Sequence, residues 1–152
     1  MGSSPWWYVV DYQPDLQQAL DALREREFQA GRYFPALDFP PFPVTPQSPA
    51  PQSLASGPQH GSIEEAVKAA EDTGTRSILD FEVLASSEDA WDLRELMPEQ
   101  RLMLFGSEQP TLAQLQASRT FPAFIGHGEG YVVTTYRGGQ PEFPYFAGSS
   151  FD

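Results

Sequence analysis

The stretch that decides the fold runs from Gly130 to Ala147 and reads GYVVTTYRGGQPEFPYFA. Residues 130–137 and 140–147 are rich in apolar and β-branched side chains, which is typical of strands. Gly138-Gly139 between them signals a two-residue hairpin turn. The prolines at 141 and 144 lack the N–H that a ladder needs, so we expect the second strand to lie at an edge of its sheet. The sequence therefore predicts a C-terminal antiparallel hairpin.

The first part of the chain predicts a strand and a helix that accompany this hairpin. Residues 5–12 alternate between two mostly apolar sides, which favours a strand in the interior of its sheet. Pro14 and Asp15 at one end and Gly31 at the other frame a helix of about 17 residues. Its buried face is expected to carry Leu16, Ala19, Leu20 and Leu23.

The middle of the chain shows a change of period. Ser62 and Glu65 fit a capping box, and the apolar residues that follow have helical spacing until Gly74. Residues 76–84 then alternate between apolar and charged side chains. This alternation predicts a strand with one face in water.

The remaining segments are short. A helix is expected over residues 87–97 and another over 110–118, whereas residues 121–125 are expected to form a strand. Residues 101–105 fit either a strand or a helix. Together the segments predict one compact α+β domain over residues 1–152, with a mostly antiparallel sheet of about four to six strands and three to four helices.

A proline-rich segment, residues 35–61, interrupts this pattern. Proline removes backbone donors and fixes φ, so neither a helix nor a central strand is expected there. Its first half has hydrophobic anchors and is interpreted as a strap across the folded body. Residues 46–60 lack such anchors, so we expect this part to be a flexible linker.

Short motifs in this segment resemble known peptide ligands. Phe39-Pro40-Pro41-Phe42-Pro43 is similar to the Phe-Pro-x-φ-Pro ligands of EVH1 domains, and residues 40–49 resemble the PxxP ligands of SH3 domains. This resemblance implies that Phe39, Pro40, Phe42 and Pro43 dock on another protein. The alternative is that the same residues form the intramolecular strap.

Composition excludes several classes of function. The chain has 152 residues and no Cys, so disulfide frameworks, zinc ribbons and thiol nucleophiles are excluded. Nine Lys and Arg against 21 Asp and Glu give a net charge of -12, which argues against binding to nucleic acid or to an anionic membrane. No signal peptide or apolar span is recognised, so we expect a cytoplasmic protein.

The run Gly126-His127-Gly128-Glu129-Gly130 is open to two interpretations. In one, His127 acts as an acid or base that Glu129 orients, in a small-molecule binder or hydrolase-like enzyme. In the other, the glycines form a connection between two strands. The spacing lacks the pattern of a nucleotide site.

Metal binding and acid–base chemistry by paired carboxylates both depend on the types and spacing of the side chains. His60 and His127 are far apart in sequence and no metal-ligand motif is present, so no metal and no cofactor are expected. Asp80 and Glu82 share one face of the strand expected over residues 76–84, a spacing compatible with acid and base roles. The alternative is a solvated strand face.

The densest acidic stretch lies on the helix expected over residues 87–97 and just beyond it. We expect a binding surface for a basic protein there, formed by Asp89, Trp91, Asp92, Glu95 and Glu99. The leading hypothesis is therefore a protein-interaction or inhibitor module, of the immunity type, rather than an enzyme. The oligomeric state is left open.

Overall fold

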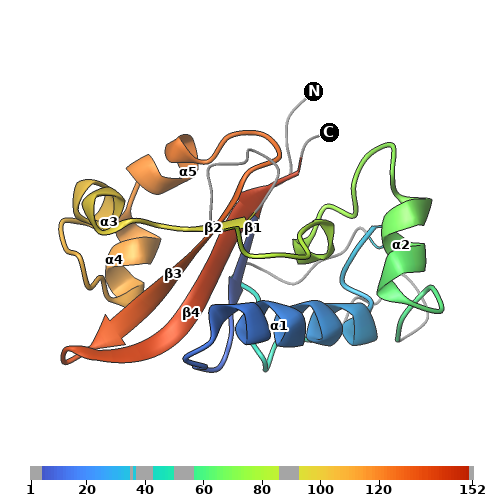
Figure 1. Ribbon diagram of the computed structural model, residues 1–152, viewed down its shortest axis with the longest axis horizontal. Helices are drawn as coiled ribbons and strands as arrows, with labels where there is room; N and C mark the ends of the chain where they lie inside the picture. The colour runs from blue at the N-terminus through green and yellow to red at the C-terminus, as the bar shows by residue number, and fades with distance from the viewer. Residues whose placement is uncertain (1–4, 35, 37–42, 50–56, 86–92, 151–152) are drawn as a thin grey trace.

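A four-stranded mixed sheet in the order β1-β4-β3-β2 forms the centre of the structure (Figure 1). The computed structural model describes residues 5–34, 36, 43–49, 57–85 and 93–150. β4 pairs antiparallel with β1 and with β3, whereas β2 pairs parallel with β3. The strands are β1 (Pro5–Val9), β2 (Leu93–Glu95), β3 (Gly130–Arg137) and β4 (Gln140–Ser149). The α+β class predicted from the sequence is confirmed.

The C-terminal hairpin forms as predicted. Gly138 and Gly139 have φ angles of 58° and 78°, and two successive positive φ angles are the mark of the type I′ turn. This turn matches the right-handed twist of the flanking strands. The two glycines therefore set the register of β3 against β4.

The predicted positions of two strands in the sheet are wrong. β4 lies in the interior, and β1 pairs only with β4 residues 145–149. Pro141 and Pro144 therefore lie beyond the β1 pairing, where a missing donor breaks no β1 ladder bond. On the other side of β4, the Thr135 hydroxyl binds both the N–H and the carbonyl of Phe143, at a register shift in the β3 pairing. A side chain thus supplies hydrogen bonds at the point where the regular ladder fails.

β1 is a strand at the end of the sheet order, and its free side is partly covered by the proline-rich segment. Val44 accepts a hydrogen bond from the Val9 N–H and donates one to the Trp7 carbonyl. The alternation that favoured an interior strand reflects burial of both faces: Trp6 and Tyr8 lie on one face, and Val9 lies on the other.

Helices cover both faces of the sheet (Figure 1). α1 (Leu16–Ala30) packs on the face that carries Trp6, Val132 and Phe146. The opposite face packs on α3 (Pro98–Phe105), α4 (Leu112–Ala117) and α5 (Thr120–Phe124). α2 (Ile63–Ala69) contacts the end of α1, in a small cluster around Phe28 and Tyr33. The described residues thus contain five α-helices, four of them of eight residues or fewer, where three to four helices were expected.

The helix ends follow the predicted capping residues with small shifts. Asp15 is the N-cap of α1, where it accepts the N–H groups of Gln17 and Gln18, and Gly31 ends the helix with φ 72°. Ser62 caps α2 by accepting the Glu65 N–H, as the capping box predicted. The Glu65 carboxylate binds the N–H of Gly61 and not that of Ser62. α2 ends at Ala69, earlier than the predicted stop at Gly74.

The strand predicted over residues 76–84 is wrong. A turn of 3-10 helix, η1 (Ile78–Asp80), occupies its centre, and Arg76 has a φ of 58° that interrupts an extended run. The Asp80 carboxylate accepts both the N–H and the hydroxyl of Thr75, and the Ser77 hydroxyl accepts the Leu79 N–H. Short polar side chains thus bind the local backbone and compete with strand formation.

Two further assignments from short apolar runs are also corrected. Residues 93–95, expected in a helix, form β2, and residues 96 and 97 lie outside any helix, between β2 and α3. The first part of that prediction, residues 87–92, lies outside the described residues. Residues 121–125 were expected to be a strand and lie mostly in α5, whose Phe121 N–H binds the Ser118 hydroxyl. The ambiguous residues 101–105 belong to α3. Short apolar runs fit both kinds of element, and tertiary packing decides between them.

Candidate functional site

The structure places His127 and Glu129 in the turn before β3. The Glu129 carboxylate accepts the Gly126 N–H at 2.6 Å and the Tyr131 hydroxyl at 3.3 Å, and it lies 3.6 Å from the Arg94 guanidinium. His127 is exposed, and no hydrogen bond joins it to Glu129 within the part of the chain that is described. Glu129 therefore closes the turn instead of orienting the imidazole.

The contacts of Glu129 link β2 to β3. The Arg94 guanidinium also lies over the Tyr131 ring, 5.4 Å from its centre. Burial and the nearby Glu129 charge raise the pKa of Tyr131, while Arg94 opposes this shift. Arg94 thus interacts with Glu129 and with the Tyr131 ring, close to the acidic surface predicted from the sequence.

The predicted acidic surface is only partly described. Glu95 on β2 and Glu99 in the first turn of α3 are both exposed, whereas Asp89, Trp91 and Asp92 lie outside the described residues. Neither Glu95 nor Glu99 forms a side-chain hydrogen bond or ion pair with another described residue. Because residues 93–95 are a strand, the single helical face expected to join these residues does not form there.

Exposed apolar side chains accompany these carboxylates. In the described chain, three of the five large hydrophobic residues that are most exposed fall between positions 97 and 103: Met97 (57%), Leu102 (54%) and Met103 (66%). Glu99, Leu102 and Met103 follow helical spacing, which places them on one face of α3. We call Glu95, Met97, Glu99, Leu102 and Met103 the α3 surface. Sequence reasoning identified its acids and missed its apolar residues.

The proline motif is also described only in part. Phe39, Pro40 and Phe42 lie outside the described residues, and Pro43 lines an apolar hollow of about 320 Å³ together with Trp7, Phe121 and Tyr145. Burial raises the pKa of Tyr145 to about 12. Pro43 thus contacts the folded body, and the docking role of the motif stays a prediction.

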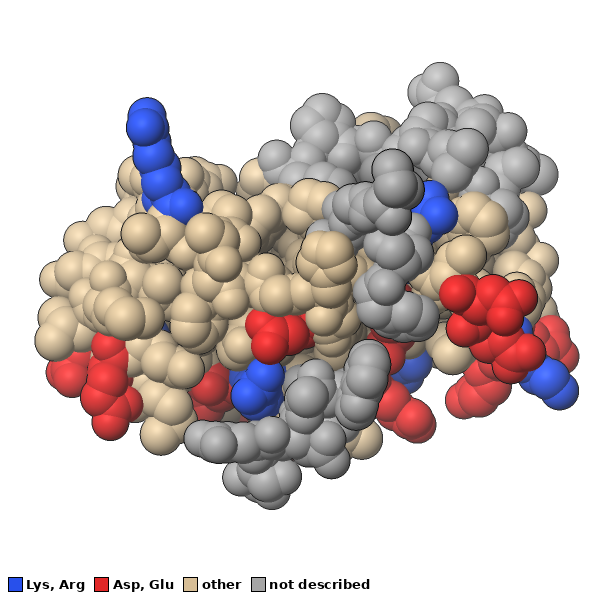
Figure 2. Space-filling view, turned by 90° about the horizontal axis from the view of Figure 1, so that it is seen from above, with Lys and Arg blue, Asp and Glu red and all other residues tan. Residues whose placement is uncertain are grey.

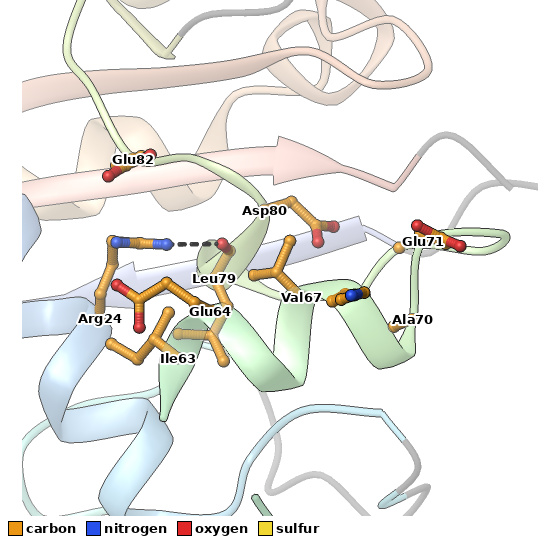
Figure 3. Close-up of a pocket in the computed structure, with 11 residues that line it drawn as sticks. Arg24, Ile63, Glu64, Val67, Ala70, Glu71, Leu79, Asp80 and Glu82 are labelled. Carbon is orange, nitrogen blue, oxygen red and sulfur yellow. Dashed lines mark hydrogen bonds between the residues drawn. The ribbon is translucent and has the colours of Figure 1, made fainter. Parts of the chain in front are cut away.

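A larger hollow of about 570 Å³ lies between α1, α2 and the segment around η1 (Figure 3). Its apolar wall includes Ile63 and Val67 of α2 and Leu79 of η1. Four carboxylates and two basic residues complete the lining: Glu64, Glu71, Asp80, Glu82, Arg24 and Lys68. We call this hollow the α2 pocket. Carboxylates gather at the same end of the molecule, on the right of Figure 2.

Arg24 extends from α1 along this pocket. Its Nη2 donates to the Leu79 carbonyl at 2.9 Å, and Figure 3 shows its side chain between Glu64 and Glu82. Burial lowers the pKa of Arg24, while the negative charges of Glu82, Asp21 and Glu64 act in the opposite direction. Arg24 therefore holds α1 against η1 and offsets part of the acidic charge around it.

Asp80 and Glu82 do line one cavity, although the strand that was expected to align them is absent. Asp80 is fixed by its two hydrogen bonds from Thr75, each 2.8 Å long, whereas the Glu82 side chain is exposed. The α2 pocket itself was missed, because its walls come from segments far apart in the sequence. The sequence did contain one signal of this pocket, namely the acidic residues in the first turn of α2. Helix capping and the helix dipole explain acidic residues at that position equally well.

Three general findings bear on the choice of function. None of the helices in the described ranges combines the length and apolar content that crossing a bilayer requires. Across the same ranges, no three His, Asp or Glu side chains are grouped to hold a metal ion. Comparisons with protein-family models, with curated proteins and with solved structures find no match for this chain.

Proposed function

We propose that this protein is a binding module for a basic protein partner, acting as an inhibitor or immunity-type protein through the α3 surface. The observation that carries the proposal is which charged side chains near this surface have partners within the described residues and which do not. Two bases close to these acids in the sequence are engaged within the protein: Arg94 with Glu129, and Arg101 with the carbonyls of Leu96 and Glu108. Glu95 and Glu99 have no such partner among the described residues, so their charge is available to a partner.

The apolar residues add a second kind of contact. Met97, Leu102 and Met103 expose flexible side chains beside the carboxylates. Methionine adapts its shape to a partner, and such residues are frequent at protein-binding surfaces. We expect the acids to speed the encounter and the apolar side chains to slow dissociation.

The first experiment captures proteins from a lysate of the source organism and washes them at about 50 mM and then about 500 mM salt, because exposed charge attraction falls steeply over this range. A basic protein that salt releases is the expected partner. Its association and dissociation rates are then measured with purified proteins.

Reversal of Glu95 and Glu99 to Lys is expected to slow association about tenfold at low salt, with less effect at high salt. A variant with Leu102→Ser and Met103→Ser is expected to speed dissociation instead. The matched control reverses Asp11 and Glu25, which are exposed outside the α3 surface and give the same change in net charge. Equal slowing by the control pair would show that net charge alone attracts the partner and would refute the assignment of the surface.

A further inference from the structure

Two apolar hollows adjoin each other where β1 and β4 meet α4 and α5. The first is the hollow of about 320 Å³ that Pro43 lines, and the second has a volume of about 270 Å³. Trp7 and Pro122 line both hollows and therefore form the boundary between them. Tyr145 lines the first hollow and Gly148 the second, and these two positions of β4 are about 10 Å apart along a strand. We call the two hollows together the Trp7 groove.

The Trp7 groove is aromatic and carries no charge. The centre of the Trp7 ring lies 6.0 Å from that of the Phe121 ring and 6.4 Å from that of the Tyr145 ring. Pro43 and Pro122 add two saturated rings to the walls. Among the described residues, no Asp, Glu, Lys or Arg lines either hollow, although the chain carries a net charge of -12. A ligand that matches this lining is uncharged and apolar.

Two hydrogen-bond donors of the groove have no partner within the described part of the protein. Tyr145 is only 4% exposed, and its hydroxyl forms no hydrogen bond with another described residue. This hydroxyl is not completely enclosed, and Tyr145 lines the first hollow, so a ligand there can reach it. The indole N–H of the half-buried Trp7 has no partner among these residues either. Because a buried polar group without a partner is costly, both donors favour a ligand that brings acceptors.

Proline-rich peptides combine the required properties. A proline residue has a backbone carbonyl that accepts hydrogen bonds, and it has no N–H that would need an acceptor in the groove. In a polyproline II helix, prolines three residues apart lie on one edge about 9 Å apart, which is close to the spacing of the two hollows along β4. Pro43 of this chain already lies against the first hollow, so a proline ring is compatible with its aromatic walls.

We propose that the Trp7 groove binds an uncharged proline-rich segment of another protein in the polyproline II conformation. One proline ring packs in each hollow, on either side of Trp7 and Pro122. Backbone carbonyls of the segment accept hydrogen bonds from the Tyr145 hydroxyl and the Trp7 indole. Recognition thus rests on ring packing and donated hydrogen bonds, and not on the negative charge of the protein.

This site goes beyond the proposed function, because its partner is uncharged and none of its residues belongs to the α3 surface. Reversal of Glu95 and Glu99 to Lys is expected to leave peptide binding in the groove unchanged. Substitutions in the groove are expected to leave the capture of a basic partner unchanged. Either proposal can therefore fail without the other.

The test titrates the intact protein with acetylated and amidated octaproline, by calorimetry and by amide chemical shifts of residues such as Trp7 and Tyr145. The control is an octapeptide of alternating Gly and Ser with the same blocked ends, which is uncharged and has carbonyls but no rings. We expect octaproline to bind at least tenfold more tightly than the control, with shifts confined to the Trp7 groove. Equal binding of the two peptides would overturn the proposal, as would binding that requires added arginines, which net charge explains.

Tyr145→Phe provides a second test. Because the hydroxyl has no partner among the described residues, its removal is expected to leave the fold intact, which urea unfolding at neutral pH checks. We expect octaproline binding to weaken about three- to tenfold, as for the loss of one hydrogen bond. Pro122→Ala, at an exposed position between the hollows, is expected to weaken binding as well.

The matched controls are Tyr136→Phe and Pro141→Ala, because neither residue lines the groove. Both are expected to leave octaproline affinity unaltered. Equal weakening by these controls would overturn the proposal, as would an unchanged affinity of the Tyr145→Phe variant.

Discussion

The Glu27 side chain offers the sharpest test of what stabilises this fold. It is fully buried near the end of α1, and Arg32 donates to both its oxygens at 2.6 Å. Arg26 adds a third hydrogen bond at 2.8 Å. Arg32 also donates to the carbonyls of Ser48 and Pro49, so the same network holds residues 43–49 against α1. The perturbation is Glu27→Gln, which keeps the shape and removes the charge.

The magnitude follows from the burial of the partner. The Arg32 side chain is only 4% exposed, so without Glu27 its charge is buried with no carboxylate beside it. Breaking a buried pair from one side costs about 3 to 5 kcal/mol, because the remaining charge loses both water and its partner. For a domain of this size, such a loss lowers Tm by about 6 to 20 °C.

The assay is urea and thermal unfolding followed by circular dichroism, with Glu25→Gln as the matched control. Glu25 lies on the same helix less than one turn before Glu27, and its side chain is exposed. Its replacement is expected to change stability by less than about 0.5 kcal/mol. A double variant, Glu27→Leu with Arg32→Leu, is expected to lose less than the sum of the two single changes. A cost below about 1 kcal/mol for Glu27→Gln would refute the reasoning, because it would mean that Arg32 reaches water without its partner.

Three other predictions test separate parts of the molecule. Gly148→Ala is expected to destabilise the fold by about 1 to 3 kcal/mol in urea unfolding, because the new Cβ would clash with the buried Trp6 ring. Gly139→Ala is expected to cost about 1 kcal/mol, since its φ is 78°, whereas Gly138→Asn at the other turn position is expected to be tolerated. Tyr145 is expected to titrate near pH 12 by ultraviolet absorbance. Because an unfolded Tyr ionises near pH 10, its contribution to stability is complete below that pH and is lost as the pH rises toward 12; Tyr145→Phe should remove this part of the alkaline loss.

Local signals were sufficient where one segment settles its own structure. The turn at Gly138-Gly139, the Gly31 cap and the Ser62 cap were all predicted, because each depends on φ angles or hydrogen bonds within a few residues. Residues 76–84 show the limit of this reasoning. Their alternation was correctly recognised, but Asp80 and Ser77 bind the nearby backbone, and that competition does not appear in a hydrophobic pattern.

Strand positions in the sheet were beyond the reach of the sequence. The prolines of β4 predicted a strand at the edge of the sheet. They lie past the end of the β1 pairing, so β4 can be an interior strand and still contain prolines. Likewise residues 93–95 become a strand because β3 offers them a free edge. Such choices depend on which segments meet in space, and period alone does not contain that information.

The sequence by itself determined the acidic charge, the absence of thiol chemistry, the α+β class and the C-terminal hairpin. Only the tertiary structure decided which charges are available: Glu129 and Arg94 engage each other, whereas Glu95 and Glu99 do not find a partner among the described residues. It also brought Glu64, Glu71, Asp80 and Glu82 around one cavity. The physical reason is that composition fixes how much charge a chain carries, while packing fixes the distance between charges and their exposure to water, and the energy of a charge depends on both.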